Sequence, residues 1–141
     1  MQYKKISPLI VVEKYLDNGN GKLDDYKVYC FNGVPKFVMI CVGRQFGKPK
    51  FYFFYRGWQF QRINKDGPNE NMDFSLPKPK NVEEMFIAAE ILSKPFPFVR
   101  VDFYLVNNAV VFGEMTFTPA GGQDSNVLPT MDQLFGDMVE I

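Results

Sequence analysis

Two stretches of the chain alternate apolar and polar residues with a period of two, which is typical of half-buried strands. The longer stretch is residues 98–122, FVRVDFYLVNNAVVFGEMTFTPAGG, in which two alternating runs flank Asn107 and Asn108. Asn tolerates the positive φ that a tight turn demands, so this segment predicts a β-hairpin. In residues 26–44 an Asn-Gly pair separates two similar runs, and the pattern predicts a second hairpin.

Apolar runs and breaker residues predict further elements. Residues 9–16, LIVVEKYL, form a β-branched run that follows Pro8, and we expect a buried strand there. Residues 51–63 predict another strand, which is broken at Gly57. The polar, proline-rich residues 64–79 predict a surface loop.

A helix is expected over residues 81–94, with Asn81 as its N-cap and Glu84 completing a capping-box pattern. Its apolar stripe consists of Val82, Met85, Phe86, Ala89 and Leu92. Two prolines end this helix, and residues 129–139 predict a last one. The elements together predict an α+β fold, an antiparallel β-sheet with a crossing helix and a C-terminal helix that cover one face of the sheet.

The register of the first hairpin decides which polar side chains share a face. With a plain two-residue turn, Asp102 faces Gly113, and Glu114 points away from it. With a three-residue turn, or with a bulge in one strand, Asp102 lies opposite Glu114. Arg100 and Thr116 then join this pair, because side chains repeat every second residue along a strand. We predict the second register.

Two carboxylates side by side repel each other unless a cation lies between them. The cation can be a metal, and such oxygen ligands suit Mg²⁺, which takes one or two carboxylates plus phosphate oxygens. It can also be an arginine, in which case Arg100, Asp102 and Glu114 form only an ion-pair cluster on an exposed sheet face. The residues alone leave both possibilities open.

The order R-x-D, hairpin, E-x-T-x-T-P-A-G-G resembles the C-terminal metal-binding hairpin of ATP-grasp enzymes, including the relatives of D-alanine–D-alanine ligase. The resemblance implies that Asp102 and Glu114 bind Mg²⁺. It also implies that Arg100 contacts the transferred phosphate or the oxyanion. Thr116 stands where the usual third ligand is Asn, and a hydroxyl is a weaker metal ligand than an amide oxygen.

The wider chain is similar to the TupA-like ATP-grasp family of bacterial surface-polymer biosynthesis, some members of which are labelled glycosyltransferases. The segments VEKYLDN, DYKVYCFNGVPKFV, KPFPFVRVDFY and FGEMTFTPAGG carry this resemblance, which covers nearly all of residues 8–141. It implies that a linker strand contacts the adenine of ATP, and the residues placed near that ring are Glu13, Lys14, Tyr15 and Leu16.

The resemblance also gives Lys27 a role, because the family's matching strand lines the active cleft. Lys27 would reach a phosphate or a substrate carboxylate. The plainer alternatives are a solvated Lys27 on an exposed face, and an ordinary core strand at residues 9–16 with Glu13 on its exposed side.

With 141 residues the chain is long enough for one domain with its own core, which we place at residues 1–141. The resemblance implies the C-terminal lobe of an ATP-grasp enzyme, without the N-terminal lobe that carries the glycine-rich lid. We therefore expect ATP and Mg²⁺ as cofactors, a carboxylate or sugar-polymer precursor as substrate, and little ligase activity from this chain alone. The alternatives are a non-catalytic binding or partner module and a glycosyltransferase. A homodimer partner or the missing lobe is expected to cover the apolar surface left open.

Composition narrows the chemistry and the compartment. The 16 basic and 16 acidic residues cancel, so bulk charge gives no reason to expect a nucleic-acid partner. The chain has no histidine, which excludes histidine-based triads and His-ligated zinc. Cys30 and Cys41 are expected about 20 Å apart along their hairpin, too far for a disulfide, which favours a reducing cytoplasm. The sequence shows neither a signal peptide nor an apolar run of membrane length.

Overall fold

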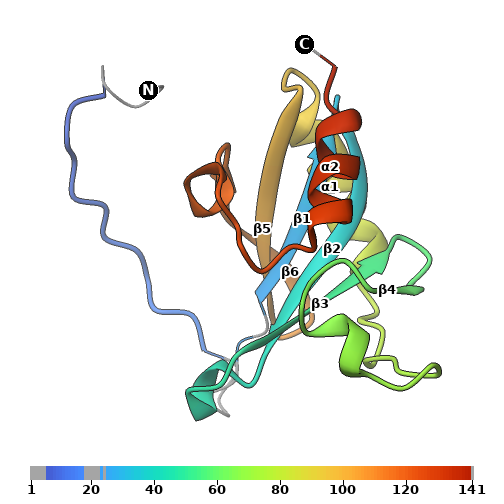
Figure 1. Ribbon diagram of the computed structural model, residues 1–141. Coiled ribbons are helices and arrows are strands. Elements are labelled where there is room, and N and C mark those ends of the chain that lie inside the picture. Colours follow the sequence, from blue (N-terminus) through green and yellow to red (C-terminus); the bar gives the residue numbers. More distant parts are fainter. Residues whose placement is uncertain (1–5, 18–22, 24, 141) are drawn as a thin grey trace.

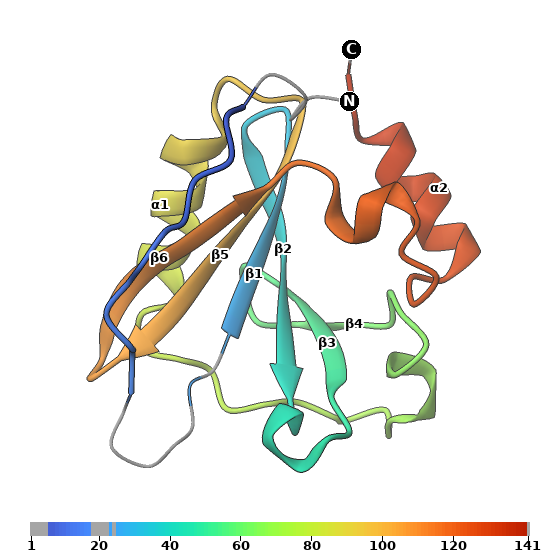
Figure 2. The ribbon, with the colours of Figure 1, turned by 90° about the vertical axis from the view of Figure 1, so that its left-hand side faces the viewer.

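In the computed structural model, which describes residues 6–17, 23 and 25–140, a six-stranded antiparallel sheet carries a helix on each face (Figure 1, Figure 2). The strands are β1 (Asp25–Phe31), β2 (Val34–Val42), β3 (Lys50–Tyr55), β4 (Phe60–Gln61), β5 (Phe98–Val106) and β6 (Ala109–Thr116). The helices are α1 (Val82–Ser93) and α2 (Pro129–Asp137). The strand order is β4-β3-β2-β1-β5-β6, and the predicted α+β fold with its two hairpins is confirmed.

The central strand β1 alternates its side chains between two cores. Val28 and Cys30 lie in the core under α1, which includes Phe86. Tyr29 and Phe31 lie in the core under α2. The prediction that both helices cover one face is therefore wrong. Every residue of β1 is buried, so each face of this strand needs its own covering layer.

Helix α1 largely follows the prediction for residues 81–94. Val82, Met85, Phe86 and Ala89 are buried on the apolar stripe, and Leu92 is half-buried. The predicted capping box is wrong in detail, because the Asn81 side chain makes no cap hydrogen bond to the helix backbone. Asn81 Nδ2 instead donates to Glu84 Oε2 at 3.0 Å, which satisfies the two side chains with each other.

A β-bulge sets the register of the β5–β6 hairpin. Arg100 pairs directly with Thr116, but β6 carries one extra residue before the pairing resumes towards the two-residue turn. The extra residue places both Gly113 and Glu114 opposite Asp102. The predicted register, with the polar residues on one face, is confirmed.

The prediction of a buried strand at residues 9–16 is wrong. Residues 6–17 form no strand, and in Figure 2 this segment runs as an extended chain past β6. Residues 9–12, LIVV, have side chains that are between 76% and 94% exposed. β-branched residues favour a strand only where they pack closely against a sheet, and this run is largely exposed.

The helices that the structure describes are short. The longest, α1, has 12 residues, and none of them is long and apolar enough to cross a membrane.

Candidate functional site: a charged cluster on the sheet

Three neighbouring strands bring the polar residues of the candidate site together. Lys27 on β1 lies opposite Asp102 on β5, and Arg100 on β5 lies opposite Thr116 on β6. Helix α2 packs Phe135 against the aromatic end of the same face. The charged residues therefore occupy the part of this face that lies beyond the aromatic core.

Asp102 is at the centre of the cluster, with 1% of its surface exposed. Arg100 holds its carboxylate with two hydrogen bonds, from Nε to Oδ1 at 2.7 Å and from Nη2 to Oδ2 at 2.8 Å. Lys27 Nζ donates a third, to Oδ2 at 2.5 Å. Both oxygens of Asp102 thus accept charge-assisted hydrogen bonds, which are among the strongest that side chains make.

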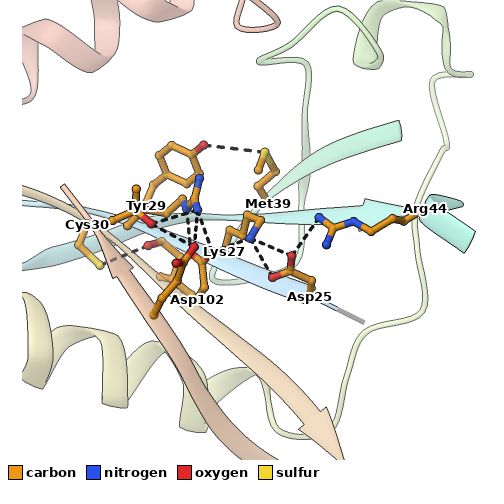
Figure 3. A network of polar contacts seen from close by, with 11 residues as sticks. Asp25, Lys27, Tyr29, Cys30, Met39, Arg44 and Asp102 are labelled. Atoms are coloured by element: carbon orange, nitrogen blue, oxygen red, sulfur yellow. Dashed lines mark hydrogen bonds and ion pairs between the residues drawn. The ribbon is translucent and has the colours of Figure 1, made fainter. Parts of the chain in front are cut away.

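Lys27 joins Asp102 to a second carboxylate, as Figure 3 shows. Its Nζ donates to Asp25 Oδ1 at 3.0 Å and lies 2.8 Å from Asp25 Oδ2. Arg44, which follows β2, donates from Nη2 to Asp25 Oδ2 at 3.2 Å. The alternative of a solvated Lys27 is wrong, because the residue is only 9% exposed.

Glu114 is held more loosely than Asp102, and 65% of its side chain is exposed. Arg100 Nη2 lies 3.4 Å from Glu114 Oε1 and donates to Thr116 Oγ1 at 3.1 Å. The Thr116 hydroxyl in turn donates to Glu114 Oε1 at 3.4 Å. Arg100 is therefore the cation shared by the two carboxylates of the hairpin.

The cluster is balanced in charge. Its acidic members are Asp25, Asp102 and Glu114, and its basic members are Lys27, Arg44 and Arg100. Burial by itself lowers the pKa of Arg100, but the hydrogen bonds and the charge of Asp102 outweigh burial and leave that pKa above its ordinary value. The guanidinium thus remains charged at any pH at which the fold exists.

Tyr29 lies beside the cluster at the start of the aromatic core. Burial raises the pKa of its hydroxyl to about 12, against the opposing effect of the nearby Arg100 charge. The hydroxyl also contacts the sulfur of Met39 at 3.9 Å. Tyr29 is therefore uncharged at neutral pH, and it separates the charged cluster from the core under α2.

Oxygen donors of the kind that Mg²⁺ prefers lie together on this face. However, no three His, Cys, Asp or Glu residues within the described ranges are placed to hold a metal ion. Both oxygens of Asp102 already have cationic partners. A metal ion therefore reaches Asp102 only by displacing Lys27 or Arg100 from its carboxylate.

A cavity of about 400 Å³ opens beside the cluster, and its lining includes Lys27, Arg44 and Arg100. Ala120 and Asp124 line it from the loop that follows β6. Ala120 has φ +49°, a region that L-residues other than Asn and Asp seldom adopt. The loop therefore holds a strained conformation at the wall of this cavity, a feature that is frequent at binding sites.

The residues expected near adenine lie on the extended segment. Glu13 lines a hollow of about 480 Å³ together with Glu114, so the structure brings these two acids to one place. Lys14 and Tyr15 have exposed side chains, and Leu16 is half-buried. The role of these residues in contacting adenine stays a prediction.

Sequence reasoning missed Asp25, Arg44 and Tyr29 as members or neighbours of the site. A signal for Asp25 was present, because it lies two residues before Lys27 and side chains on one strand face repeat every second residue. Arg44 gave no such signal. Its contact with Asp25 depends on the antiparallel pairing of β1 with β2, which places Asp25 opposite Cys41.

Comparison with protein families gives a match of residues 1–140 to the family described as TupA-like ATPgrasp. Searches of curated proteins and of solved structures returned no match. The family match spans nearly the whole chain, including the extended segment and all strands of the cluster. The chain therefore belongs to the TupA-like ATP-grasp family.

Proposed function

We propose that the charged cluster binds the phosphates of ATP together with Mg²⁺, as the first step of a carboxylate–amine ligation. Family membership supports the nucleotide, since ATP-grasp enzymes generally use ATP and Mg²⁺. The observation that carries the proposal is the cluster itself, in which three carboxylates are paired with three cations. The three cations line one cavity, together with two further acids, Asp66 and Asp124. A cavity with cations and carboxylates nearby suits a ligand that combines anionic phosphates with a metal cation.

The equal numbers of carboxylates and cations in the cluster explain why the phosphates of ATP and Mg²⁺ would bind together. A bare dication must displace Arg100 and Lys27 from Asp102, and a bare phosphate must pull the same cations away from carboxylates. Either exchange leaves one partner uncompensated in a partly buried site, which is costly. When both ligands arrive, Asp102 and Glu114 are available to the metal, and Arg100 and Lys27 to the phosphate.

In the proposed reaction, a carboxylate oxygen attacks the terminal phosphorus of ATP, ADP leaves, and an acyl phosphate forms. An amine then attacks the acyl carbon, phosphate leaves, and the amine nitrogen loses a proton as the amide forms. Arg100 and Lys27 would offset the negative charge that develops on the transferred group, which is the main way such sites lower a barrier. The metal, when bound, supplies further charge neutralisation at the phosphate oxygens.

We place this activity in the biosynthesis of a bacterial cell-surface polysaccharide, in the cytoplasm, where ATP is available. The support is the family and the two free cysteines, Cys30 and Cys41, which are both buried and unbridged. A second candidate function is a binding module without turnover. The complete pairing of Asp102 within the cluster favours it, because such a network also stabilises a fold.

Calorimetry tests the proposal with four titrations, in which ATP, Mg²⁺, MgATP and buffer are added to the wild-type chain. We expect MgATP to bind at least tenfold more tightly than ATP, and Mg²⁺ alone to give no measurable heat. Glu114→Gln should remove most of the Mg²⁺ dependence, because this exposed carboxylate is the easiest to free. Asp73→Asn, an exposed acid in a distant loop, is the matched control. Equal affinity for ATP with and without Mg²⁺ in the wild type would reject the proposal.

A further inference from the structure

A second cavity, of about 440 Å³, lies between α2 and the sheet. Its floor is aromatic and consists of Tyr29, Phe31, Phe98 and Phe135. These rings pack on one another with centroid distances between 5.2 and 6.2 Å. A cavity of this size and apolar character is typical of a small-molecule site.

The lining of this cavity carries charge of only one sign. Asp124 and Asp132 contribute carboxylates, and the lining that the structure describes includes no lysine or arginine. Lys65 lies on a neighbouring hollow that shares both acids. Within the described part of the chain, however, no lysine or arginine nitrogen lies within 4 Å of either carboxylate.

Aromatic faces and carboxylates attract the same kind of ligand. A ring face carries negative charge density and stabilises a cation placed over it, and a carboxylate adds a direct ion pair. We propose that this cavity, which we call the amine pocket, binds a primary ammonium group carried on an apolar body. Asp132 is exposed, and Asp124 is half-buried with its Oδ1 accepting a hydrogen bond from the amide of Asn126 at 3.0 Å. An anion of the same shape is disfavoured because both acids repel it, and a neutral molecule binds more weakly because it forms no ion pair.

The position of the amine pocket connects it to the charged cluster. Asp124 lines both the amine pocket and the cavity beside Lys27 and Arg100. Tyr29, on the floor of the pocket, lies next to Arg100. Resting on the proposed function, the amine that attacks the acyl phosphate would carry an apolar body and would enter beside the phosphate site. The binding itself depends on no nucleotide, so it can be tested separately.

The test is an NMR titration of the ¹⁵N-labelled chain, without ATP or Mg²⁺, with three molecules of one shape. These are phenethylammonium, 2-phenylethanol and 3-phenylpropionate. We expect the ammonium to shift the amide signals of Val127 and Gly136 and to bind at least tenfold more tightly than the alcohol. The propionate should produce no shifts at these residues.

Two variants locate the binding. Gly136 lines the pocket, and a Cβ added there meets no atom within 4 Å, so Gly136→Leu adds bulk to the lining without a clash at its Cβ, and it should abolish binding. Asp132→Asn should weaken the ammonium about tenfold, whereas Asp137→Asn on the same helix should not. Equal binding of all three probes, no binding of any, or ammonium binding that survives Gly136→Leu would overturn the inference. The calorimetric result with MgATP would stand unaffected by any of these outcomes.

Discussion

Lys27 is the residue whose environment differs most from that of an ordinary strand lysine. Its ammonium is nearly enclosed and lies between Asp25 and Asp102, whose oxygens are 2.5 to 3.0 Å away. A buried charge is tolerated only with such partners, and removing one partner leaves the others uncompensated. The cluster thus stabilises the fold and, by our account, also keeps two cations ready for a phosphate.

Replacing Lys27 tests whether the cluster stabilises the fold. Lys27→Met keeps the length of the side chain but leaves Asp25 and Asp102 with one cation fewer. We expect the free energy of unfolding, measured with urea, to fall by about 3 kcal/mol. Lys36→Met, on an exposed position of β2, is the control and should change it by less than about 0.5 kcal/mol. A loss for Lys27→Met no larger than that of the control would contradict the assignment.

Tyr29 gives a pH dependence with a defined sign. Its pKa is about 12 in the folded chain against 10.0 for an ordinary tyrosine, so above pH 10 the unfolded chain loses this proton first. Stability from this group is complete below pH 10 and falls between pH 10 and 12, by about 2 to 3 kcal/mol in total. Unfolding measured across this range should show the fall, and Tyr29→Phe should remove that part of it. An unchanged slope in Tyr29→Phe would show that the hydroxyl is not responsible.

At the scale of elements, the bulge in β6 is what joins the two acids of the hairpin. Without the extra residue, Glu114 would lie on the other face of the sheet, away from Asp102. Gly113 makes the bulge possible, because a Cβ there would lie 3.0 Å from the carbonyl oxygen of Asp102 and 3.0 Å from Cε2 of Tyr104. The carbonyl belongs to a paired strand and cannot easily move.

Gly113→Ala should therefore destabilise the chain by about 1 to 3 kcal/mol. It should also weaken MgATP binding, since the crowding acts on Asp102. The matched substitution is Gly136→Ala in α2, where the new methyl group meets nothing and where alanine is the better helix former. Thermal unfolding should rank Gly136→Ala at or above the wild type and Gly113→Ala below it. The reverse order would contradict our view of the bulge.

The end of α2 is held by Asn32, which lies in the turn between β1 and β2. Asn32 Nδ2 donates to the carbonyl of Met138 at 2.7 Å, and the amide of Glu140 donates to Asn32 Oδ1 at 3.0 Å. We call these two side-chain hydrogen bonds the clamp. Because Asn32 has φ +50°, which glycine adopts readily, Asn32→Gly keeps the turn and removes only the clamp.

We expect Asn32→Gly to speed hydrogen exchange of the amides at residues 138–140, with little effect on the strands. Asn32→Asp, which keeps one acceptor and loses the donor, should give an intermediate rate. Unchanged exchange at these amides in Asn32→Gly would show that the clamp does not hold the end of α2.

The sequence predicted those features that depend on neighbouring residues. Both hairpins and α1 follow from turn residues and apolar periodicity, and the β5–β6 register follows from the requirement that Arg100, Asp102 and Glu114 share a face. Residues 9–16 were wrongly predicted, because a β-branched run does not reveal whether a sheet lies beside it. The burial of Lys27 was also hidden, since it depends on the pairing of β1 with β5. Long-range contacts of this kind leave no local pattern.

At the scale of the whole molecule, one sheet face is divided between two tasks. Helix α2 covers its aromatic part (Figure 2) and lines the amine pocket. The cations of the charged cluster, whose contacts Figure 3 shows, line the neighbouring cavity. The other face packs against α1. This division places both proposed ligand sites on one side of the chain, with Asp124 between them.

By our account, Asp102 holds Lys27 and Arg100 until a metal takes their place. The most direct test is the affinity of Asp102→Asn for ATP without Mg²⁺, compared with the wild type in the same buffer, after circular dichroism shows that the variant is folded. Our account predicts that the variant binds ATP alone more tightly than the wild type, because Lys27 and Arg100 each lose one carboxylate partner, and that added Mg²⁺ brings no further gain. Weaker binding of ATP alone, or a Mg²⁺ dependence equal to that of the wild type, would contradict it.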